Sequence, residues 1–242
     1  MRGVSPLDLI DAAFPGRAAF DVAVSRALLR EVAAGKRPET LRVYRPDDVV
    51  AFSTTDLRRP GFARAVHAAQ RERFDAALRL AGGAAAVFTT ETLAFAWCTP
   101  ETDERAGIHA RFARTADWVA RALRRLGVDA RVGEVSGAYC PGDWSVNARG
   151  VRGAAHTGGV IVVGGSARVR AVLAPVYAEL EFPFTPESAG AIEDEVGPVS
   201  LDAVRDALLA ELPGEPDLRA VQPDPELLDH AARFESSHRI SS

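Results

Sequence analysis

Residues 76–86, Ala-Ala-Leu-Arg-Leu-Ala-Gly-Gly-Ala-Ala-Ala, are the stretch from which the fold of this chain can be worked out. A short β-rich run, residues 76–80, leads into Gly82 and Gly83, where a backbone without side chains can approach a ligand closely. Arg79 is suited to bind a phosphate or carboxylate beside them. The stretch is neither a Walker A loop nor a G-x-G-x-x-G turn. Taken alone, this signal is weak, and a small-residue turn packed under a helix is the more common explanation.

The segments before this stretch predict a helix followed by two strands and a second helix. Over residues 18–34 the apolar side chains recur at helical spacing, and Gly35 follows as a stop. Residues 40–44 and 49–53 are short β-rich runs, and residues 62–73 predict the next helix.

The segments after it predict further strands and helices. Residues 84–97 predict a hairpin that turns at residues 89–91, and residues 128–132 and 160–163 predict short strands. Helices are expected over residues 108–126, 169–180 and 201–212, the last capped by Ser200 or Asp202 and the first ended by Gly127. We expect arginines on the outer face of the 108–126 helix and an apolar inner stripe of Phe112, Ala116, Val119, Ala120 and Leu123.

Several predicted strands come in adjacent pairs and do not alternate strictly with helices. This order predicts an α+β fold, with a mixed, largely antiparallel sheet packed with helices. A length of 242 residues suits one large domain or a domain with a small appendage. We place the domain at residues 1–212, followed by a Pro/Asp-rich C-terminal tail with a short helix at residues 213–242.

Composition excludes several classes of function. The net charge is −4, and acidic and basic residues are interspersed, so no basic stripe predicts a nucleic-acid partner. No apolar run is long enough to span a membrane, and the N-terminus lacks the apolar core of a signal peptide. Two cysteines make no disulfide framework, so we expect a reduced, cytoplasmic location. No Cys/His spacing predicts a metal site.

Two further segments carry candidate chemistry. Cys140 lies in a loop-like segment that runs to Asn147, and its thiol is a possible nucleophile if a nearby cation lowers its pKa; an inert thiol is the commoner case. Cys98 follows an apolar run, which indicates packing. His156 precedes the strand at residues 160–163, where it can contact a ligand, act in proton transfer, or simply bond to local backbone.

Other charged residues are expected to have structural roles. Asp21 lies early in the first helix between apolar neighbours, so we expect it to be partly buried or to face the helix dipole. The remaining histidines are expected to be solvated: His67, His109, His230 and His238.

Taken in order, these pieces resemble the biotin/lipoate protein ligase catalytic-domain family, which includes lipoate–protein ligase A and octanoyltransferases. Arg79-x-x-Gly82-Gly83 is similar to that family's R-x-x-G-G-G-A-V segment, and His156-x-Gly158 before an apolar strand also matches. The pieces that carry the likeness lie between residues 18 and 210: Asp21–Leu29, Leu41–Pro46, Leu126–Val128 and the Cys140–Asn147 segment.

The resemblance implies a fold related to class II aminoacyl-tRNA synthetases and to biotinyl protein ligases. Ligase members use ATP and Mg to activate lipoate and attach it to a lysine of a carrier domain. Another branch carries octanoyl or lipoyl groups on a cysteine, at about the position of Cys140. The expected partners are lipoyl carrier domains or a glycine-cleavage H-type protein. The residues expected at the ligand or adenylate are Arg79, Gly82, Gly83, Ala84, Asp143 and His156.

The chain departs from the family pattern where its essential lysine is expected. The path from Asp143 to His156 is short by roughly a dozen residues, the size of a functional loop, and Lys36 is the only lysine of the chain. Either the lysine loop is deleted or mobile residues are missing from the sequence. We expect a lipoate–protein ligase-like protein that attaches lipoate or octanoate through an acyl-adenylate. The alternatives are a Cys140-dependent octanoyl or lipoyl transferase and a non-catalytic protein that binds an acyl ligand or a lipoyl domain.

Overall fold

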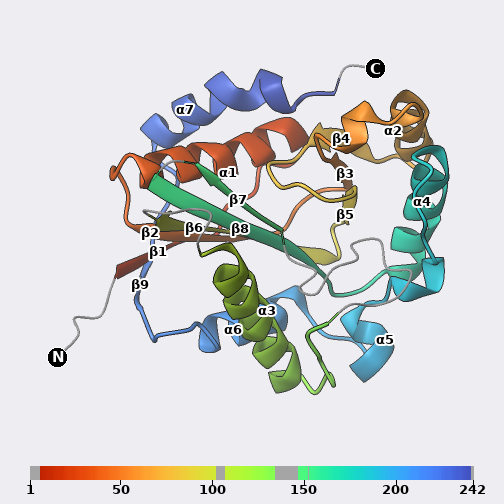
Figure 1. The fold of residues 1–242 in the computed structure, drawn as a ribbon. Coiled ribbons are helices and arrows are strands. Elements are labelled where there is room, and N and C mark those ends of the chain that lie inside the picture. Colours follow the sequence, from red (N-terminus) through yellow and green to blue (C-terminus); the bar gives the residue numbers. More distant parts are fainter. Residues whose placement is uncertain (1–5, 102–106, 134–146, 152, 241–242) are drawn as a thin grey trace.

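The computed structural model describes residues 6–101, 107–133, 147–151 and 153–240. Its larger sheet has six strands in the order β7-β8-β6-β2-β1-β9 (Figure 1). Pairing is antiparallel from β7 through β8 and β6 to β2, and parallel from β2 through β1 to β9. These strands are β1 Pro6–Ile10, β2 Glu39–Tyr44, β6 Thr92–Glu101, β7 Asn147–Val151, β8 Gly153–Val162 and β9 Asp217–Ala220.

A second sheet of three strands lies beside the first. Its central strand, β3 (Val49–Phe52), is parallel to β4 (Asp75–Leu78) and antiparallel to β5 (Ala86–Phe88). The connection from β4 to β5 contains Arg79, Gly82 and Gly83. This connection is therefore anchored at both ends in the same small sheet.

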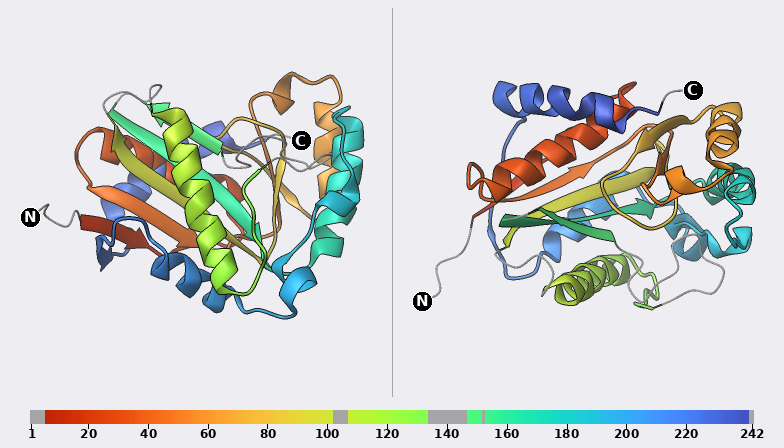
Figure 2. Two further views of the ribbon diagram at one scale, coloured as in Figure 1. Left: turned by 60° about the horizontal axis from the view of Figure 1, so that its bottom comes forward. Right: turned by 45° about the horizontal axis from the view of Figure 1, so that its top comes forward.

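Helices cover both sheets (Figure 2). On the larger sheet, α1 (Ala18–Ala33) and α7 (Pro225–Glu235) cover one face, and α3 (Ile108–Arg125) and α6 (Leu201–Ala210) cover the other. The smaller sheet packs against α2 and α4. The remaining bounds are α2 Phe62–Arg71, α4 Ser166–Glu179, α5 Ile192–Val196, η1 Asp56–Arg58, η2 Pro186–Ser188 and η3 Ser236–His238. The predicted α+β class with a mixed sheet is confirmed.

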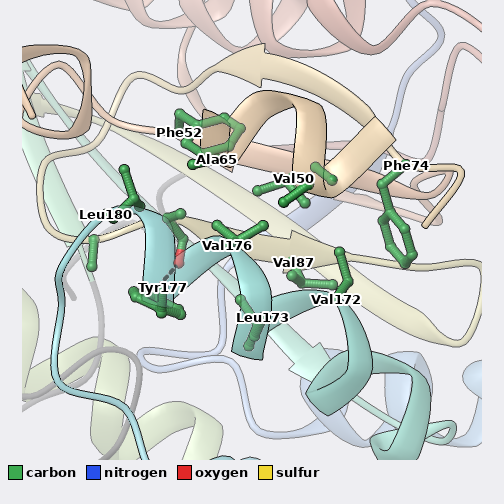
Figure 3. Packing of buried hydrophobic residues seen from close by; sticks show 14 of the residues in the cluster. Val50, Phe52, Ala65, Phe74, Val87, Val172, Leu173, Val176, Tyr177 and Leu180 are labelled. Carbon is green, nitrogen blue, oxygen red and sulfur yellow. Dashed lines mark hydrogen bonds between the residues drawn. The ribbon is translucent and has the colours of Figure 1, made fainter. Parts of the chain in front are cut away.

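Three apolar clusters make up the core. The cluster between the smaller sheet, α2 and α4 is shown in Figure 3, where Phe52, Val87 and Tyr177 lie among branched aliphatic side chains. A second cluster fills the space between the larger sheet, α3 and α6, with Trp118 at its centre. The third lies between the opposite face of that sheet, α1 and α7. Burial on both faces explains why these strands are so rich in apolar residues.

Several elements were foreseen correctly. α1 covers the predicted stretch, the Ser200 hydroxyl accepts from the Ala203 amide at the start of α6, and Gly127 follows α3 with a φ of +91°. A left-handed φ after a helix favours glycine because a Cβ would clash there.

The predicted hairpin over residues 84–97 is wrong. Its two arms are β5 and β6, which belong to different sheets, so the turn at residues 89–91 crosses from one sheet to the other. The predicted strand over residues 128–132 is also absent, although these residues are described. Local β propensity does not reveal a strand's partner, because pairing is a tertiary contact.

The predicted inner stripe of α3 is largely confirmed, since Ala116 and Ala120 are buried and Val119 and Leu123 pack against the core. The prediction missed that Trp118 and Ala122 are fully buried as well. Arg111, expected on an outer face of arginines, is buried and paired with Glu101 at 2.7 Å. Both apolar faces of α3 are used, because the second face lines the cavity described below.

None of the described helices is both long and apolar enough to cross a membrane.

Candidate functional site

A cavity of about 520 Å³ lies where the two sheets meet. Both sheets contribute lining residues, for example Ala96 on β6 and Ala86 on β5, and α3 contributes Val119 and Leu123. The lining is mostly apolar, and its volume lies within the usual range for small-molecule sites. The cavity therefore suits an apolar ligand with a small polar end.

The first wall of the cavity is the connection between β4 and β5. Its lining residues are Arg79, Leu80, Ala81, Ala84 and Ala86. The Arg79 guanidinium donates to the carbonyl oxygens of Gly82 at 2.7 Å and Ala84 at 2.5 Å. Gly83 has a φ of +84°, which closes the turn. Arg79 thus holds the shape of its own loop, and Gly82 and Gly83 form the turn without lining the cavity.

This wall is also held from the structure behind it. The Arg79 amide donates to the Phe52 carbonyl of β3 at 2.8 Å, which extends the β3–β4 pairing by one residue. From α4, the buried Tyr177 hydroxyl donates to the Ala85 carbonyl at 2.5 Å (Figure 3). Buried hydrogen bonds of this kind fix backbone positions, because breaking one leaves a polar group without water.

The second wall is β8, which carries His156, Gly158 and Gly159. The structure places His156 within β8, opposite Cys98 of β6, and not before the strand as expected. Its side chain is 5% exposed, and its Nδ1 atom has no hydrogen-bond partner among the described residues. Burial lowers the pKa of His156 to about 4. A neutral imidazole, with one buried nitrogen that has no partner among the described residues, therefore lies in the wall of the cavity.

Gly158 and Gly159 of β8 leave space for two rings. A Cβ on Gly158 would lie 2.9 Å from the His156 Cε1 atom, and a Cβ on Gly159 would lie 2.7 Å from the Phe95 ring. Contacts this short are not tolerated. The imidazole therefore packs directly against the backbone of Gly158, and the phenyl ring against that of Gly159. This close packing explains why Gly158 and Gly159 occur together within this strand.

A buried charged pair supports the cavity from the side of α1. Arg42 of β2 is fully buried, pairs with Asp21, and donates to the Asp21 carbonyl at 2.8 Å and to the Ser25 hydroxyl at 3.1 Å. Burial raises the pKa of Asp21, and Arg42 opposes that shift. Ser25 lines the cavity, so this pair fixes the turn of α1 that faces a ligand. Asp21, expected to be partly buried or to face the helix dipole, is buried. Its partner Arg42 was not predicted, although an arginine within an apolar strand is a signal of such a pair.

Cys140 and Asp143 lie outside the described residues. Cys98 is fully buried, and burial raises the pKa of its thiol to about 12, so it is the packing residue that the sequence predicted.

The only lysine of the chain lies away from the cavity. Lys36 follows the C-terminal end of α1 and pairs with Glu226 of α7 at 2.9 Å. Ser25 marks the cavity, and the eight helical residues from there to Ala33 advance the chain by about 12 Å. Lys36 is therefore not available to a ligand in the cavity.

The cationic side chains among the described lining residues are Arg79 and Arg131. Arg79 is bonded to loop carbonyls, and the exposed Arg131 pairs with Asp129 at 2.6 Å. No group of three or more His, Cys, Asp or Glu side chains within the described residues is arranged to hold a metal ion. Both lining cations therefore already have partners within the described residues.

A regular strand occupies the interval where the lysine loop is expected. β7 runs from Asn147 to Val151 and pairs with β8, with Val151 opposite Ala154. The full sequence is continuous there, so the shortened path is a property of the chain.

Comparison with known proteins places these features in context. Residues 17–213 match the model of the lipoyl protein ligase A/B catalytic domain. An octanoyl-[GcvH]:protein N-octanoyltransferase from Geobacillus kaustophilus is 26% identical over 168 residues. The match covers 65% of this chain and 59% of that protein, so the chain spans less than two thirds of its relative.

Solved structures show the same fold. A lipoate-protein ligase A bound with ATP superposes with a TM-score of 0.77 at 22% identity, over 96% of this chain and 94% of that one. A putative lipoate protein ligase from T. acidophilum with bound lipoic acid gives a TM-score of 0.75 at 21% identity, over 97% and 95% of the two chains. At these identities the likeness concerns the fold.

Proposed function

Because the chain belongs to the lipoyl protein ligase A/B catalytic-domain family, we propose that it transfers octanoyl or lipoyl groups to a carrier-domain lysine through a thioester on Cys140. The observation that carries this proposal is a largely apolar cavity from which the only lysine of the chain is remote. Lipoyl carrier domains of the glycine-cleavage H type are the proposed acceptors, since the octanoyltransferase relative is named for one.

The cavity is suited to an eight-carbon acyl chain. Alanine, valine and phenylalanine side chains surround most of it, and burial of apolar surface contributes about 0.8 kcal/mol per methylene. The polar end of the acyl group would lie between the Arg79 loop and His156. A neutral His156 offers a hydrogen bond there without the cost of burying a charge.

The proposed reaction has two balanced steps. The Cys140 thiolate attacks the acyl carbonyl of an octanoyl-carrier thioester, the donor's C–S bond breaks, and the donor thiolate leaves and takes up a proton. The neutral amine of the acceptor lysine then attacks the new thioester, an amide bond forms, the enzyme's C–S bond breaks, and the amine proton passes to the Cys140 thiolate. No external activation is required, because a thioester is already an activated acyl group.

Intact-mass spectrometry tests the first step directly. Incubation with octanoyl-acyl carrier protein should add one octanoyl group to the chain, and Cys140→Ser should abolish the adduct. Cys98→Ser is the matched control and should keep it, because the Cys98 thiol is buried and un-ionised. An adduct that survives Cys140→Ser, or no adduct on the unaltered chain, would reject the transferase.

The second candidate is the ligase that forms an acyl-adenylate from lipoate, ATP and Mg. The specific observation in its favour is Arg79-x-x-Gly82-Gly83, which follows a strand and borders the cavity as the family resemblance implies. A lysine directed at the phosphate is missing from the described lining, and loss of such a charge costs about 3–4 kcal/mol of barrier. We expect no lipoate-dependent ATP–pyrophosphate exchange, and exchange at ordinary rates would favour the ligase. Binding of lipoic acid or a lipoyl domain with neither adduct nor exchange would indicate a non-catalytic protein.

A further inference from the structure

The end of the chain contacts the strand that leads into the Arg79 loop. η3 ends at His238, which was expected to be solvated but is only 3% exposed. Its Nδ1 atom bonds the Leu78 carbonyl at 2.7 Å, so Nδ1 carries the proton and donates. The next residue, Arg239, forms an antiparallel bridge with Ala77. Leu78 is the last residue of β4 and directly precedes Arg79.

This contact covers an otherwise open edge. In the three-stranded sheet β4 is an edge strand, paired with β3 on one side only. Residues 238 and 239 pair with it from the other side, in the manner of a very short fourth strand. An edge strand is the least constrained part of a sheet, so a contact at its end controls where the following loop begins.

The same terminal segment also packs on α1, which covers the larger sheet. α7 packs on α1 through Leu227 and Ala231, and both belong to the apolar cluster under the larger sheet. Arg26 of α1 donates to the Ser237 hydroxyl at 2.7 Å and lies over the Phe234 ring. Figure 1 shows α7 lying along α1, and the described residues that follow α7 reach β4 through the bridge between Arg239 and Ala77.

Beyond His238, the chain joins the core of the smaller sheet. The Ile240 side chain packs against the cluster that contains Phe52 and Val87. The terminal segment therefore begins on the core of one sheet and ends on that of the other. The cavity lies between these sheets, so the segment spans the junction that the ligand occupies.

We propose that residues 225–240, through His238, are a positioning element that holds the Arg79 loop against the β8 wall of the cavity. His238 acts through the Leu78 carbonyl and does not touch the ligand. The functional part of this proposal rests on the acyl-binding function given above, whereas its structural part does not.

Hydrogen exchange measures the structural part on the full chain. His238→Leu removes the donor and should raise amide exchange in residues 79–88 at least tenfold, while exchange in α3 stays unchanged. His238→Asn should restore protection, because its amide nitrogen lies near the position of Nδ1. His67→Leu is the matched control, since His67 is an exposed histidine on α2, outside residues 225–240.

Calorimetric titration with lipoic acid measures the functional part. We expect about tenfold weaker binding for His238→Leu, near-normal binding for His238→Asn and unchanged binding for His67→Leu, as a single buried hydrogen bond and its loop order imply. Unchanged exchange in residues 79–88, a rise spread over the whole chain, or a local rise with unchanged affinity would each overturn the proposal. If the unaltered chain binds no lipoic acid, the acyl-binding function fails, and the exchange experiment alone decides the role of His238.

Discussion

The two walls of the cavity differ in how their polar groups are hydrogen-bonded. The Arg79 loop is held by hydrogen bonds from its own arginine, from Tyr177 behind it and, one residue upstream, from His238. The β8 wall has bare backbone at Gly158 and Gly159 and a buried His156 nitrogen without a partner among the described residues. The Arg79 loop is therefore held by several hydrogen bonds to its own carbonyl groups, whereas the β8 wall leaves the His156 Nδ1 atom without one among the described residues.

Replacing Arg79, whose hydrogen bonds hold the loop from within, should have the largest effect on ligand binding. Arg79→Leu deletes two charge-assisted hydrogen bonds to the loop carbonyls, each worth about 1.5–3 kcal/mol. We expect lipoic acid to bind about a hundredfold more weakly, as measured by calorimetry. Arg71→Leu, on the exposed end of α2, is the control. A normal affinity in Arg79→Leu would show that the loop keeps its shape without the arginine.

The unpartnered histidine should make stability depend on pH. Its pKa is about 4 in the folded chain against an ordinary 6.5, so between these values the unfolded chain binds a proton that the folded chain does not. This contribution is present in full above pH 6.5 and is lost as the pH falls towards 4, amounting to up to about 3 kcal/mol.

Denaturant unfolding at several pH values measures this effect. His156→Gln should flatten the slope between pH 4 and 6.5 relative to the unaltered chain, whereas the exposed His67→Gln should leave it unchanged. Equal slopes in all three proteins would mean that His156 titrates normally, and the contrast between the two walls would then be lost.

Loss of the hydrogen bond from Tyr177 of α4 to the loop should have a smaller effect, seen in stability. Tyr177→Phe removes the hydroxyl that donates to Ala85 and keeps the ring in its cluster. We expect a loss of about 1 kcal/mol in the free energy of unfolding, measured in urea, and faster amide exchange confined to residues 82–88. Unchanged exchange in this region would show that the Tyr177 hydroxyl does not hold the loop in place.

The smallest effect is expected at the only lysine. Lys36→Met breaks an exposed ion pair with Glu226 on the far side of α1 and touches neither wall. Octanoyl transfer should proceed at an unchanged rate in a gel-shift or mass assay of the carrier domain. A large loss of transfer would bring Lys36 into the mechanism and contradict its position in the structure.

The part of the site that the sequence predicted is the part that depends on local chemistry. Arg79 with its glycines was recognisable because a turn with φ of +84° and a close approach of backbone favour glycine at specific positions. His156-x-Gly158 was recognised as a pattern, but its burial within β8 was not, since burial depends on what packs against a strand. His238 was misjudged for the same reason: it lies in a polar tail, and only its contact with β4 buries it.

By itself, the sequence determined the α+β class, most helices and their ends, and the absence of any lysine other than Lys36, because propensity, periodicity and composition are local properties. The tertiary structure alone decided that residues 84–97 divide between two sheets, that α3 uses both apolar faces, that β9 joins the larger sheet, and that α7 packs on the core. These outcomes depend on pairing between residues far apart in the chain. The same long-range contacts place Arg79 and His156 on facing walls and leave Lys36 outside.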